Sequence, residues 1–445
     1  MAGTPSPTTV STSLQRIATL AREAPQLAFT TLAHHIDIGF LREAYRRTRK
    51  DGAVGVDGQT AQAYAEDLER NLESLLHRFK SGAYQAPPVR RVYIPKDDGR
   101  STRPLGIPSF EDKVLQRAVA MVLEAVYEQD FLDCSYGFRP KRSQHQALDI
   151  LWGQTMQMGG GYVISIDIKS YFDTIEHGQL RAILDQRVRD GVIRRTIDKW
   201  LKAGVLENGC VSHPDTGVPQ GSGVSPLLSN LFLHEVLDTW FESVVKPRLE
   251  ENAMLVRFAD DAIILCAREH DANRVMAVLP KRFEKYGLTL HPDKTRVIRF
   301  QRPPRHPTGA SRADASTPGT FDLLGFTHYW GRSRKGNWVV KRKTASKRLS
   351  RALKRINLWC REHRHAKLGW QHQKLVLKLR GHYGYYGISG NFRGLNQFRE
   401  GVVSRWRKWL SRRSQRSRIE WERFARLLKH YPLPKAKIVH GIPSP

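Results

Sequence analysis

The chain has 445 residues, of which 40% are hydrophobic and 26% are charged. That length is enough for roughly two to four domains with a sizeable buried core. Its 73 Lys and Arg residues exceed its 43 Asp and Glu residues and give a formal net charge of +30. This imbalance favours a polyanionic partner, with nucleic acid as the first expectation and an anionic membrane surface as the alternative.

Several classes of protein do not fit the sequence. No apolar run approaches the ~18 residues of a membrane span, and residues 1–15 lack the basic flank and apolar core of a secretory signal. The four cysteines are widely spaced, which excludes a dense disulfide framework and a Cys-rich zinc site. We therefore expect a reducing, cytoplasmic setting.

The first part of the chain predicts a strand followed by a long helix. Residues 91–95 (RVYIP) are expected to form a short strand that is closed by a Lys-Asp-Asp-Gly turn at residues 96–99. Residues 109–127 carry apolar side chains at helical spacing, and Ser109 is the expected N-cap.

Further along the chain, three short apolar segments predict strands. Residues 162–167 (YVISID) end in a carboxylate, and residues 255–258 and 262–266 are separated by little more than Asp260 and Asp261. The latter two segments predict a β-hairpin with an acidic turn. This mixture of strands and helices indicates an α+β body.

The last quarter of the chain carries nearly all of the excess positive charge. Residues 331–445 contain 31 Lys and Arg residues against 4 acidic residues, whereas the first 330 residues carry a net charge of only +3. Residues 301–319 are rich in Pro, Gly, Ser and Thr and predict a surface loop at the join. Beyond residue 331 the pattern favours helices, for example over 344–359, so we predict a basic helical appendage.

Three aspartates stand beside the predicted apolar strands. A carboxylate in such a place is costly unless it is solvated, paired or metal-bound. Asp167 on one strand, facing Asp260 and Asp261 on a hairpin, is a pattern suited to hold two Mg²⁺ ions about 3.5–4 Å apart for in-line phosphoryl transfer. For the Asp-Asp pair alone, an ordinary polar turn is the alternative, as the Asp-Asp-Gly of residues 97–99 illustrates.

The order of several sequence blocks resembles that of bacterial group II intron-encoded reverse transcriptases, also called maturases. The resemblance runs from about Asp57 to the C-terminus. Its blocks are GAVGVDG (52–58), YIPKDDGRSTRPLGIPSFEDKVLQ (93–116), CSYGFRPKRSQHQAL (134–148), SIDIKSYFDTI (165–175), GVPQGSGVSPLLSNLFLHEVLD (217–238), VRFADDAIIL (256–265), GLTLHPDKT (287–295) and FDLLGF (321–326). The resemblance implies an α+β right-hand polymerase, with fingers and an antiparallel palm sheet, followed by a helical thumb/maturase domain.

The resemblance also implies a division into domains. An N-terminal extension and the start of the fingers would occupy residues 1–85, and fingers and palm residues 86–330. The thumb or maturase domain would follow at 331–400 and a basic DNA-binding segment at 401–445. Many members of this family end in a zinc-stabilised endonuclease domain with paired cysteines. The chain has no such pairs, so we expect no endonuclease domain and no second-strand cleavage.

The family motif assigns the chemistry to the three aspartates. Asp167, Asp260 and Asp261 match the palm carboxylates that bind two Mg²⁺ ions, and the backbone carbonyl of Ile168 matches a further ligand. The hairpin reads Phe-Ala-Asp-Asp where Tyr is common at the first position, which removes a hydroxyl and keeps the ring.

Five residues match positions that bind the incoming dNTP. Lys96 and Arg103 match the basic pair on the triphosphate, where Arg supplies a fork and Lys a point charge. Phe172 matches a steric gate against a ribose 2′-OH, Gln220 a residue near the 3′-OH and base, and Lys294 the palm lysine near the triphosphate. The alternatives are solvated surface cations for the charged residues and a core aromatic for Phe172.

Nucleic-acid contacts are expected near the end of the chain. Leu324 and Gly325 match the primer grip, for which an ordinary strand end is the alternative. Cationic side chains at helical spacing are expected to follow phosphates, and Trp406 and Trp409 either stack on bases or pack in the helical core. The predicted cationic contacts are Lys347, Arg348, Arg351, Lys354, Arg355, Arg405, Arg407 and Lys408.

The leading hypothesis is an RNA-directed DNA polymerase that also binds its intron RNA to assist splicing and mobility by retrohoming. Its expected partners are intron RNA, an RNA template with a DNA primer, target DNA and dNTPs. We expect it in the bacterial cytoplasm as a ribonucleoprotein. The alternatives are a host-adopted enzyme in phage defence or DNA repair, and an RNA-binding splicing cofactor with incidental polymerase activity. Three intact aspartates argue against a dead enzyme.

Overall fold

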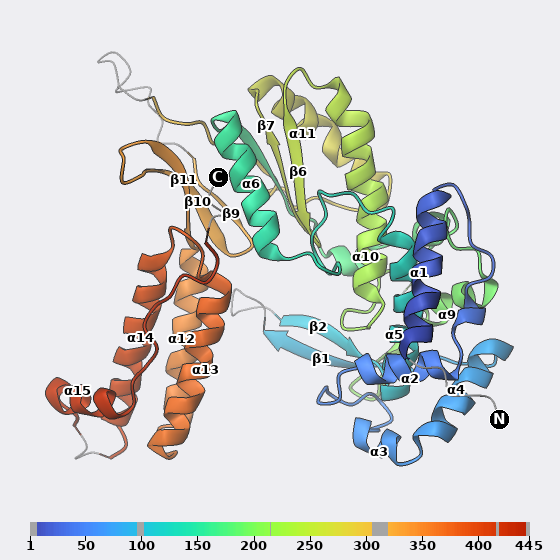
Figure 1. Cartoon of the computed structure of the whole chain (residues 1–445), viewed down its shortest axis with the longest axis horizontal. Coiled ribbons are helices and arrows are strands. Elements are labelled where there is room, and N and C mark those ends of the chain that lie inside the picture. Colours follow the sequence, from blue (N-terminus) through green and yellow to red (C-terminus); the bar gives the residue numbers. More distant parts are fainter. Residues whose placement is uncertain (1–6, 96–101, 214, 305–318, 415–417, 442–445) are drawn as a thin grey trace. The chain divides into compact units, whose positions relative to one another are not determined.

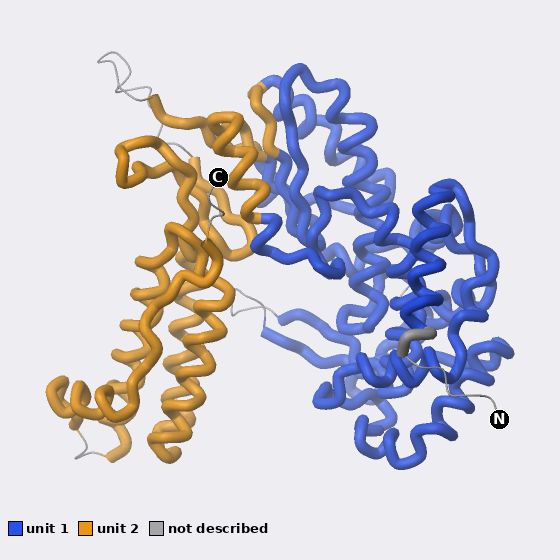
Figure 2. Tube along the Cα trace, viewed as in Figure 1, with its two compact units in different colours: residues 1–147, 164–264, 270–296 blue, residues 148–163, 265–269, 297–445 orange. Residues whose placement is uncertain are grey.

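A computed structural model describes residues 7–95, 102–213, 215–304, 319–414 and 418–441 (Figure 1). The chain forms two compact units, which are coloured separately in Figure 2. Unit 1 comprises residues 1–147, 164–264 and 270–296, and unit 2 comprises residues 148–163, 265–269 and 297–445.

Helix α5 (Phe110–Tyr127) is the central helix of the first part of unit 1, and α1 and α2 both pack against it. Its side chains Val114, Leu115 and Val122 are completely buried. The helix begins as predicted, because Ser109 Oγ accepts a hydrogen bond from the backbone N–H of Asp112 at 3.1 Å. The surrounding elements are α1 (Pro7–Glu23), η1 (Ala33–His35), α2 (Ile38–Arg47), α3 (Ala61–Glu66) and α4 (Leu68–Ser81).

A four-stranded sheet in unit 1 has the order β2-β1-β4-β5. Strand β1 (Val89–Pro95) pairs antiparallel with β2 (Thr102–Ile107), with Ile94 opposite Arg103. It pairs parallel with β4 (Val205–Glu207), which pairs with β5 (Cys210–Ser212). The predicted strand at 91–95 is confirmed, whereas the predicted turn and Lys96 lie outside the described residues.

The second sheet has the order β6-β7-β3-β8 and carries the acidic hairpin. Apolar, largely β-branched segments form its buried middle, as the pattern predicted. Its strands are β3 (Tyr162–Ile166), β6 (Ala253–Phe258), β7 (Asp261–Cys266) and β8 (Arg296–Arg299). Strands β6 and β7 are hydrogen-bonded neighbours joined by two residues, so the predicted hairpin is confirmed.

The remaining helices of unit 1 follow β3 and flank the hairpin strands in sequence. Helix α10 continues into two π-helical segments, η2 and η3, and then a short 3₁₀ turn, η4. The bounds are α7 (Tyr171–Thr174), α8 (His177–Leu184), α9 (Gly191–Leu201), α10 (Ser225–Leu233), η2 (His234–Thr239), η3 (Phe241–Val245), η4 (Lys246–Arg248) and α11 (Glu269–Glu284).

Unit 2 combines a three-stranded antiparallel sheet with a group of helices. The sheet order is β11-β10-β9, formed by β9 (Phe321–Leu323), β10 (Phe326–Arg332) and β11 (Trp338–Thr344). Helix α6 (Gln144–Met158) contacts β11, because Trp152 Nε1 donates to the Val340 carbonyl at 2.9 Å. The helices that follow are α12 (Ser346–Glu362), α13 (Leu368–Tyr386), α14 (Phe392–Leu410) and α15 (Trp421–His430).

Helices α12, α13 and α14 lie side by side and enclose their own core (Figure 1). Leu375, Leu379, Leu395 and Trp406 are completely buried there. The helix predicted over 344–359 begins later than expected, at Ser346. Thr344 instead ends β11, where it pairs with Phe326 of β10.

The start of the appendage also differs from the prediction. The boundary predicted between residues 330 and 331 falls inside β10, and residues 338–344 are strand rather than helix. Among the described residues, no helix is long and apolar enough to cross a membrane.

Candidate active site

A cavity of about 420 Å³ in unit 1 brings together most of the residues predicted to bind metal and nucleotide. It is lined by Arg103, Pro104, Asp167, Ile168, Lys169, Ser170, Tyr171, Phe172, Asp173, Gln220, Asp260, His291 and Lys294. A larger cavity in unit 1, of about 550 Å³, contains none of the predicted catalytic residues. We therefore choose the candidate site by the residues that line it, and not by the volume of the cavity.

Asp167 directly follows the last residue of β3 and is held through its backbone. Its N–H donates to Thr295 Oγ1 at 3.2 Å, and its carbonyl accepts from the His291 N–H at 2.8 Å. Its side chain is partly exposed and forms an ion pair with Lys294, whose Nζ lies 3.2 Å from Oδ1. The GLTLHPDKT block (287–295) thus positions the first carboxylate.

Asp260 and Asp261 occupy the turn between β6 and β7. The residue before them, Ala259, has a φ of +56°, a left-handed conformation that is uncommon for a residue other than glycine. Asp260 lines the cavity, and Asp261 is the first residue of β7. The strained turn therefore sets the direction in which the acidic pair points.

The carboxylates influence one another electrostatically. Burial and the nearby charge of Asp167 raise the pKa of Asp260, which Arg103 partly offsets. Asp261 is exposed to solvent, and its pKa is raised to about 6 by desolvation from the protein packed around it, followed by the charges of Asp260 and Asp167. Three carboxylates that repel one another in this way favour a bound cation.

The donor set fits Mg²⁺. Mg²⁺ prefers oxygen ligands and is commonly held by one or two carboxylates together with water and substrate phosphates. Among the described residues, no group of three or more His, Cys, Asp or Glu side chains is arranged to hold a metal ion by itself. The carboxylates would therefore need water and substrate phosphates to complete a Mg²⁺ site.

Three of the predicted nucleotide-binding residues surround the carboxylates. Arg103 is exposed on β2, Phe172 is half-buried in α7, and Gln220 lies in the loop before α10. All three line the cavity that contains Asp167 and Asp260. Lys96 lies outside the described residues.

The loop that carries Gln220 is tightly held. The backbone carbonyl of Gln220 accepts a hydrogen bond from the Gly106 N–H at 2.7 Å. Gly221 has a φ of +105°, and a Cβ there would lie 2.8 Å from the Gly106 carbonyl oxygen, so only glycine fits. Gln116 Oε1 accepts from Ser222 Oγ at 2.9 Å and from the next backbone N–H at 2.8 Å.

Sequence reasoning missed three residues of this site. His291 lines the cavity, while Thr295 and Gln116 hold the backbone of the site. All three lie within blocks that carried the family resemblance, HPDKT and KVLQ. Because two of them act by holding backbone groups, only the folded geometry shows their contribution.

The predicted primer grip lies in unit 2, in the turn between β9 and β10. Leu324 and Gly325 both have positive φ values, +49° and +79°. The Leu324 carbonyl accepts from Tyr385 Oη at 3.0 Å, and the Gly325 carbonyl accepts from the Ala345 N–H at 2.9 Å. The turn is therefore fixed against the start of α12 and the end of α13.

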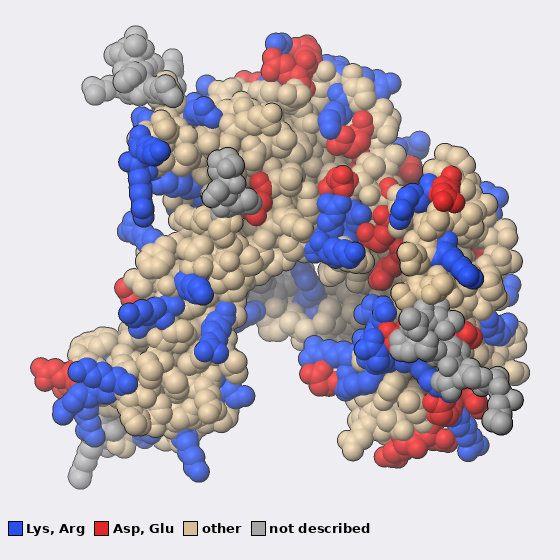
Figure 3. All heavy atoms as spheres, viewed as in Figure 1, with Lys and Arg blue, Asp and Glu red and all other residues tan. Residues whose placement is uncertain are grey.

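The predicted cationic contacts differ in how far their side chains are exposed. Arg351 is half-buried, and the half-buried Arg405 donates to the Gly401 carbonyl at 3.0 Å. Arg407 stacks on Trp421 at 3.9 Å from the ring centroid and donates to the Ile419 carbonyl. The exposed members are Lys347, Arg348, Lys354, Arg355 and Lys408. On the face drawn in Figure 3, Lys and Arg side chains are spread over unit 2 with few acidic side chains among them.

The two tryptophans with alternative interpretations belong to the helical core. Trp406 is completely buried, and its Nε1 donates to Gln371 Oε1 at 2.9 Å. Trp409 is half-buried, and its Nε1 donates to Asn357 Oδ1 at 2.9 Å. Trp406 is therefore a core residue, and Trp409 packs against the same core while it stays partly exposed.

Comparison with known families identifies the chain. Residues 94–328, more than half of its length, match the family described as "Reverse transcriptase (RNA-dependent DNA polymerase)". The chain belongs to the reverse transcriptase family. Membership in this family implies a right-hand polymerase fold, with which the mixed helices and antiparallel strand pairs agree.

Individual relatives place this reverse transcriptase near the group II intron proteins. "Group II intron-encoded protein LtrA" of Lactococcus lactis subsp. cremoris is 37% identical over 228 residues, which cover 50% of this chain and 37% of the relative. "Protein YkfC" of Escherichia coli (strain K12) is 39% identical over 233 residues, which cover 51% and 61%. The predicted resemblance is confirmed, and the alignments span less than two thirds of either relative's own length.

Proposed function

We propose that unit 1 is an RNA-directed DNA polymerase that extends a DNA primer on an RNA template. The observation that carries this proposal is a single cavity. Asp167 and Asp260 line it together with Arg103, Phe172 and Gln220. The cavity therefore offers groups suited to each part of a dNTP. Carboxylates could bind the metal ions that accompany the triphosphate, a cation could bind the phosphates, and an aromatic ring and a fixed loop could contact the sugar and base. The family match over residues 94–328 supports the same reaction.

Asp167, Asp260 and Asp261, with the Ile168 carbonyl, would hold two Mg²⁺ ions. When bound, such ions activate the primer 3′-OH and offset charge on the leaving pyrophosphate. The protein's own contribution is to hold the carboxylates: the Thr295 and His291 bonds fix Asp167, and the β6–β7 turn fixes the other two.

The cations and the aromatic ring would select the nucleotide. The triphosphate brings about four negative charges, and the exposed Arg103 offers a bidentate fork to them. Lys294 offsets the charge of Asp167 at 3.2 Å and lies in the same cavity, where it is available to phosphates. Phe172 would sit against the sugar and exclude a 2′-OH, so that deoxynucleotides are favoured.

We propose further that the cationic helices of unit 2 bind RNA, including the structured intron RNA whose splicing and mobility the protein would assist. The net charge of +27 over residues 331–445 is self-repelling without a polyanionic partner. The exposed cations on α12 support this role. The printed names of group II intron relatives support the choice of intron RNA.

Primer extension tests the polymerase directly. The wild type is compared with an Asp260→Ala/Asp261→Ala variant on an RNA template with Mg²⁺, first with dNTPs and then with rNTPs. We expect extension with dNTPs only, and its loss in the variant. Extension that survives in the double variant would contradict the assignment of the carboxylates.

A splicing assay tests the second role. The rate of intron excision is measured at low Mg²⁺, where the RNA folds poorly by itself. The RNA is tested alone, with the wild type, and with the double variant Asp260→Ala/Asp261→Ala. We expect the variant to support splicing as well as the wild type, because RNA binding is assigned to unit 2. No stimulation by either protein would favour the host-adopted role over the maturase role.

A further inference from the structure

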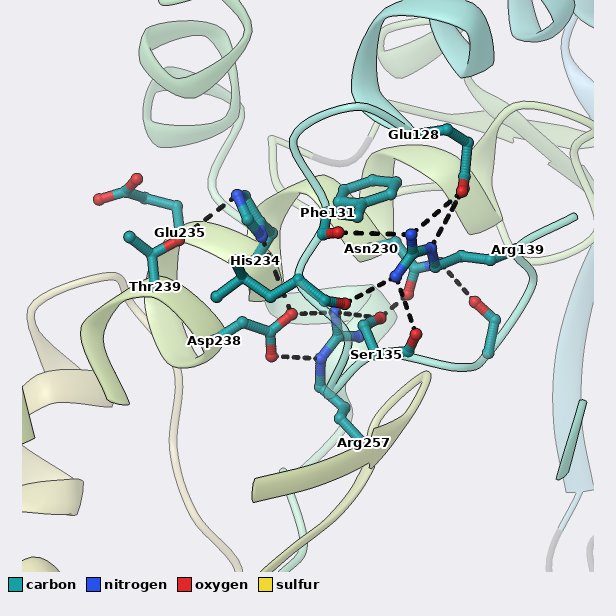
Figure 4. Close-up of polar contacts among 12 residues, drawn as sticks. Glu128, Phe131, Ser135, Arg139, Asn230, His234, Glu235, Asp238, Thr239 and Arg257 are labelled. Carbon is teal, nitrogen blue, oxygen red and sulfur yellow. Dashed lines mark hydrogen bonds and ion pairs between the residues drawn. The ribbon is translucent and has the colours of Figure 1, made fainter. Parts of the chain in front are cut away.

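Arg257, on β6, is a completely buried charge, and Figure 4 shows it beside Asp238 and Ser135. All five N–H donors of its guanidinium are used. Nε and Nη2 donate to the two carboxylate oxygens of Asp238 at 2.7 and 2.5 Å. Nη2 also donates to Ser135 Oγ at 2.8 Å, and Nη1 donates to Asn230 Oδ1 at 2.9 Å.

The fifth bond reaches the turn itself. Arg257 Nη1 donates to the carbonyl of Ala259 at 3.0 Å, in the residue with left-handed backbone that precedes Asp260. An alanine in that conformation is disfavoured unless its surroundings hold it. Arg257 is thus joined by a hydrogen bond to the one peptide group whose conformation sets the direction of Asp260.

The CSYGFRP segment closes the other side of the turn and so gains a role that sequence reasoning left open. Backbone hydrogen bonds of 2.8 Å join Arg257 to Cys134 and to Tyr136. A Cβ on Gly137 would lie only 2.3 Å from the Ala259 nitrogen, so glycine alone permits this approach. Asn230 Nδ2 donates to the Gly137 carbonyl at 2.6 Å and ties the segment to α10.

Packing alone does not explain a charge in this place. A buried ion pair is often no more stabilising than apolar side chains of the same volume, because both ions lose their hydration. Asp238 is also completely buried, so the pair has no access to solvent. What a guanidinium adds is a rigid planar fork with donors in several fixed directions. Here those directions lead to α10, to η2, to residue 135 and to the catalytic turn.

We propose that Arg257, held by Asp238, is a positioning residue for the catalytic carboxylates. It fixes the left-handed turn at Ala259 and so directs Asp260 into the cavity shared with Asp167. This inference rests on the proposed polymerase function, because it takes the acidic turn to be the metal-binding part of the site.

A matched control exists in the same unit. Arg187 is also nearly buried and pairs through two nitrogens with a carboxylate, Asp130, at 2.8 and 3.2 Å. It donates to the carbonyls of three residues near the N-terminal helix, Ala21, Ala24 and Leu27. Arg187→Lys therefore removes an equivalent fork without touching the β6–β7 turn.

The experiment compares full-length wild type, Arg257→Lys and Arg187→Lys. Each protein is titrated with Mn²⁺ alone and followed by electron paramagnetic resonance, and its Tm, kcat and KM for dTTP are measured on a poly(A) template. For Arg257→Lys we expect Mn²⁺ affinity and kcat to fall at least about tenfold, with KM changed less than threefold. For Arg187→Lys we expect a lower Tm with Mn²⁺ affinity and kcat unchanged.

Equal losses of Tm in the two variants, with Mn²⁺ affinity and kcat unaffected in both, would overturn the proposal and leave Arg257 as a structural residue. If Arg257→Lys does not fold, Ser135→Ala decides, because it removes only one partner of Nη2. We expect Ser135→Ala to weaken Mn²⁺ binding in the same direction, and an unchanged affinity would overturn the proposal. A wild type whose Mn²⁺ affinity depends on Arg257 but which incorporates no dTTP would instead contradict the proposed function.

Discussion

The buried arginines of unit 1 and the exposed cations of α12 in unit 2 use positive charge in opposite ways. In unit 1, Arg257, Arg139 and Arg187 are buried and paired with carboxylates at 2.5 to 3.1 Å. In unit 2, Lys347 and Lys354 on α12 are exposed to solvent. Buried pairs fix geometry, whereas exposed cations without rigid partners are suited to a flexible polyanion. The difference supports the proposal that chemistry belongs to unit 1 and binding of nucleic acid to unit 2.

The largest expected effect is the loss of chemistry in Asp167→Asn. Asparagine keeps the shape and an oxygen acceptor for Lys294, but it removes the charge that would bind a cation. Because a metal ion contributes several kcal/mol to transition-state stabilisation, we expect nucleotide insertion to slow about 10³-fold. Single-turnover insertion measures the rate, and filter binding should show unchanged RNA affinity. An insertion rate close to that of the wild type would assign the catalytic charge elsewhere.

The next effect concerns selection of the sugar. We expect Phe172→Ala to reduce the preference for dNTP over rNTP about 10²-fold, because the cavity would then admit a 2′-OH. The ratio of kcat/KM values for dTTP and UTP measures this preference. The matched control is Phe172→Tyr, which keeps the ring and should keep the preference. If Phe172→Ala discriminates as the wild type does, the ring is a core residue rather than a steric gate.

A smaller effect is expected from neutralising three exposed cations of unit 2. In Lys347→Gln/Lys354→Gln/Arg355→Gln we expect RNA affinity to fall about tenfold at 0.15 M salt. We also expect the slope of log K against log salt to decrease by about 2, since each single-strand phosphate contact contributes about 0.7. Insertion at saturating RNA should be unchanged.

The control for that variant makes the same change in net charge within unit 1. It replaces by Gln three exposed cations on or next to α11, namely Arg274, Lys281 and Lys285. We expect this control to leave both RNA affinity and the salt slope close to the wild type. Equal losses in the two triple variants would mean that total charge, and not the surface of unit 2, governs binding.

The smallest effect concerns stability alone and arises at the start of α5. Asp112 is buried and accepts a hydrogen bond from Tyr84 Oη, and burial raises its pKa to about 7. The folded protein therefore holds this proton more tightly than the unfolded chain. That contribution to stability is complete below about pH 4 and is lost as the pH rises through 7.

An uncharged residue at this position should avoid that loss. We expect Asp112→Asn to have a higher free energy of unfolding than the wild type at pH 8, by about 2 kcal/mol, and a smaller advantage at pH 5. Urea denaturation at the two pH values measures the difference. A difference that does not change with pH would show that Asp112 is already ionised in the folded protein at pH 5, so that its pKa is not raised.

Local patterns predicted the elements that carry the chemistry. The apolar segments that end at Asp167 and lie on either side of Asp260 formed strands. Short apolar runs between polar or turn residues are typical of buried strands. Ser109 capped α5 because its hydroxyl meets a local need of the helix N-terminus. These features depend on neighbours in sequence, which is why they were predictable.

The start of unit 2 was less predictable, because its determinants are distant in sequence. Strand β11 reads WVVKRKT, and Val340, Arg342 and Thr344 are its buried positions. Because a cation occupies one of these buried positions, the sequence shows no apolar period of two. Thr344 reads as the start of a helix, yet its N–H donates to Asn391 Oδ1 at 2.9 Å and it pairs with Phe326. A partner 47 residues away cannot be inferred from a helical pattern.

The cluster around Arg257 shows the same limit within the active site. Its partners Asp238 and Ser135 are separated from it by 19 and 122 residues. One signal was present, since an arginine inside the apolar strand VRFADD needs a buried partner. Only the fold shows which carboxylate supplies it.

The most direct test of the division between the units is one titration with two readouts. RNA template–primer is titrated against wild type, Asp260→Ala/Asp261→Ala and the α12 triple variant, and both affinity and maximal dNTP insertion rate are measured. The account predicts that the aspartate variant loses the rate and keeps the affinity, while the α12 variant loses affinity and keeps the rate. A single variant that loses both in equal measure, while its Tm stays unchanged, would contradict it.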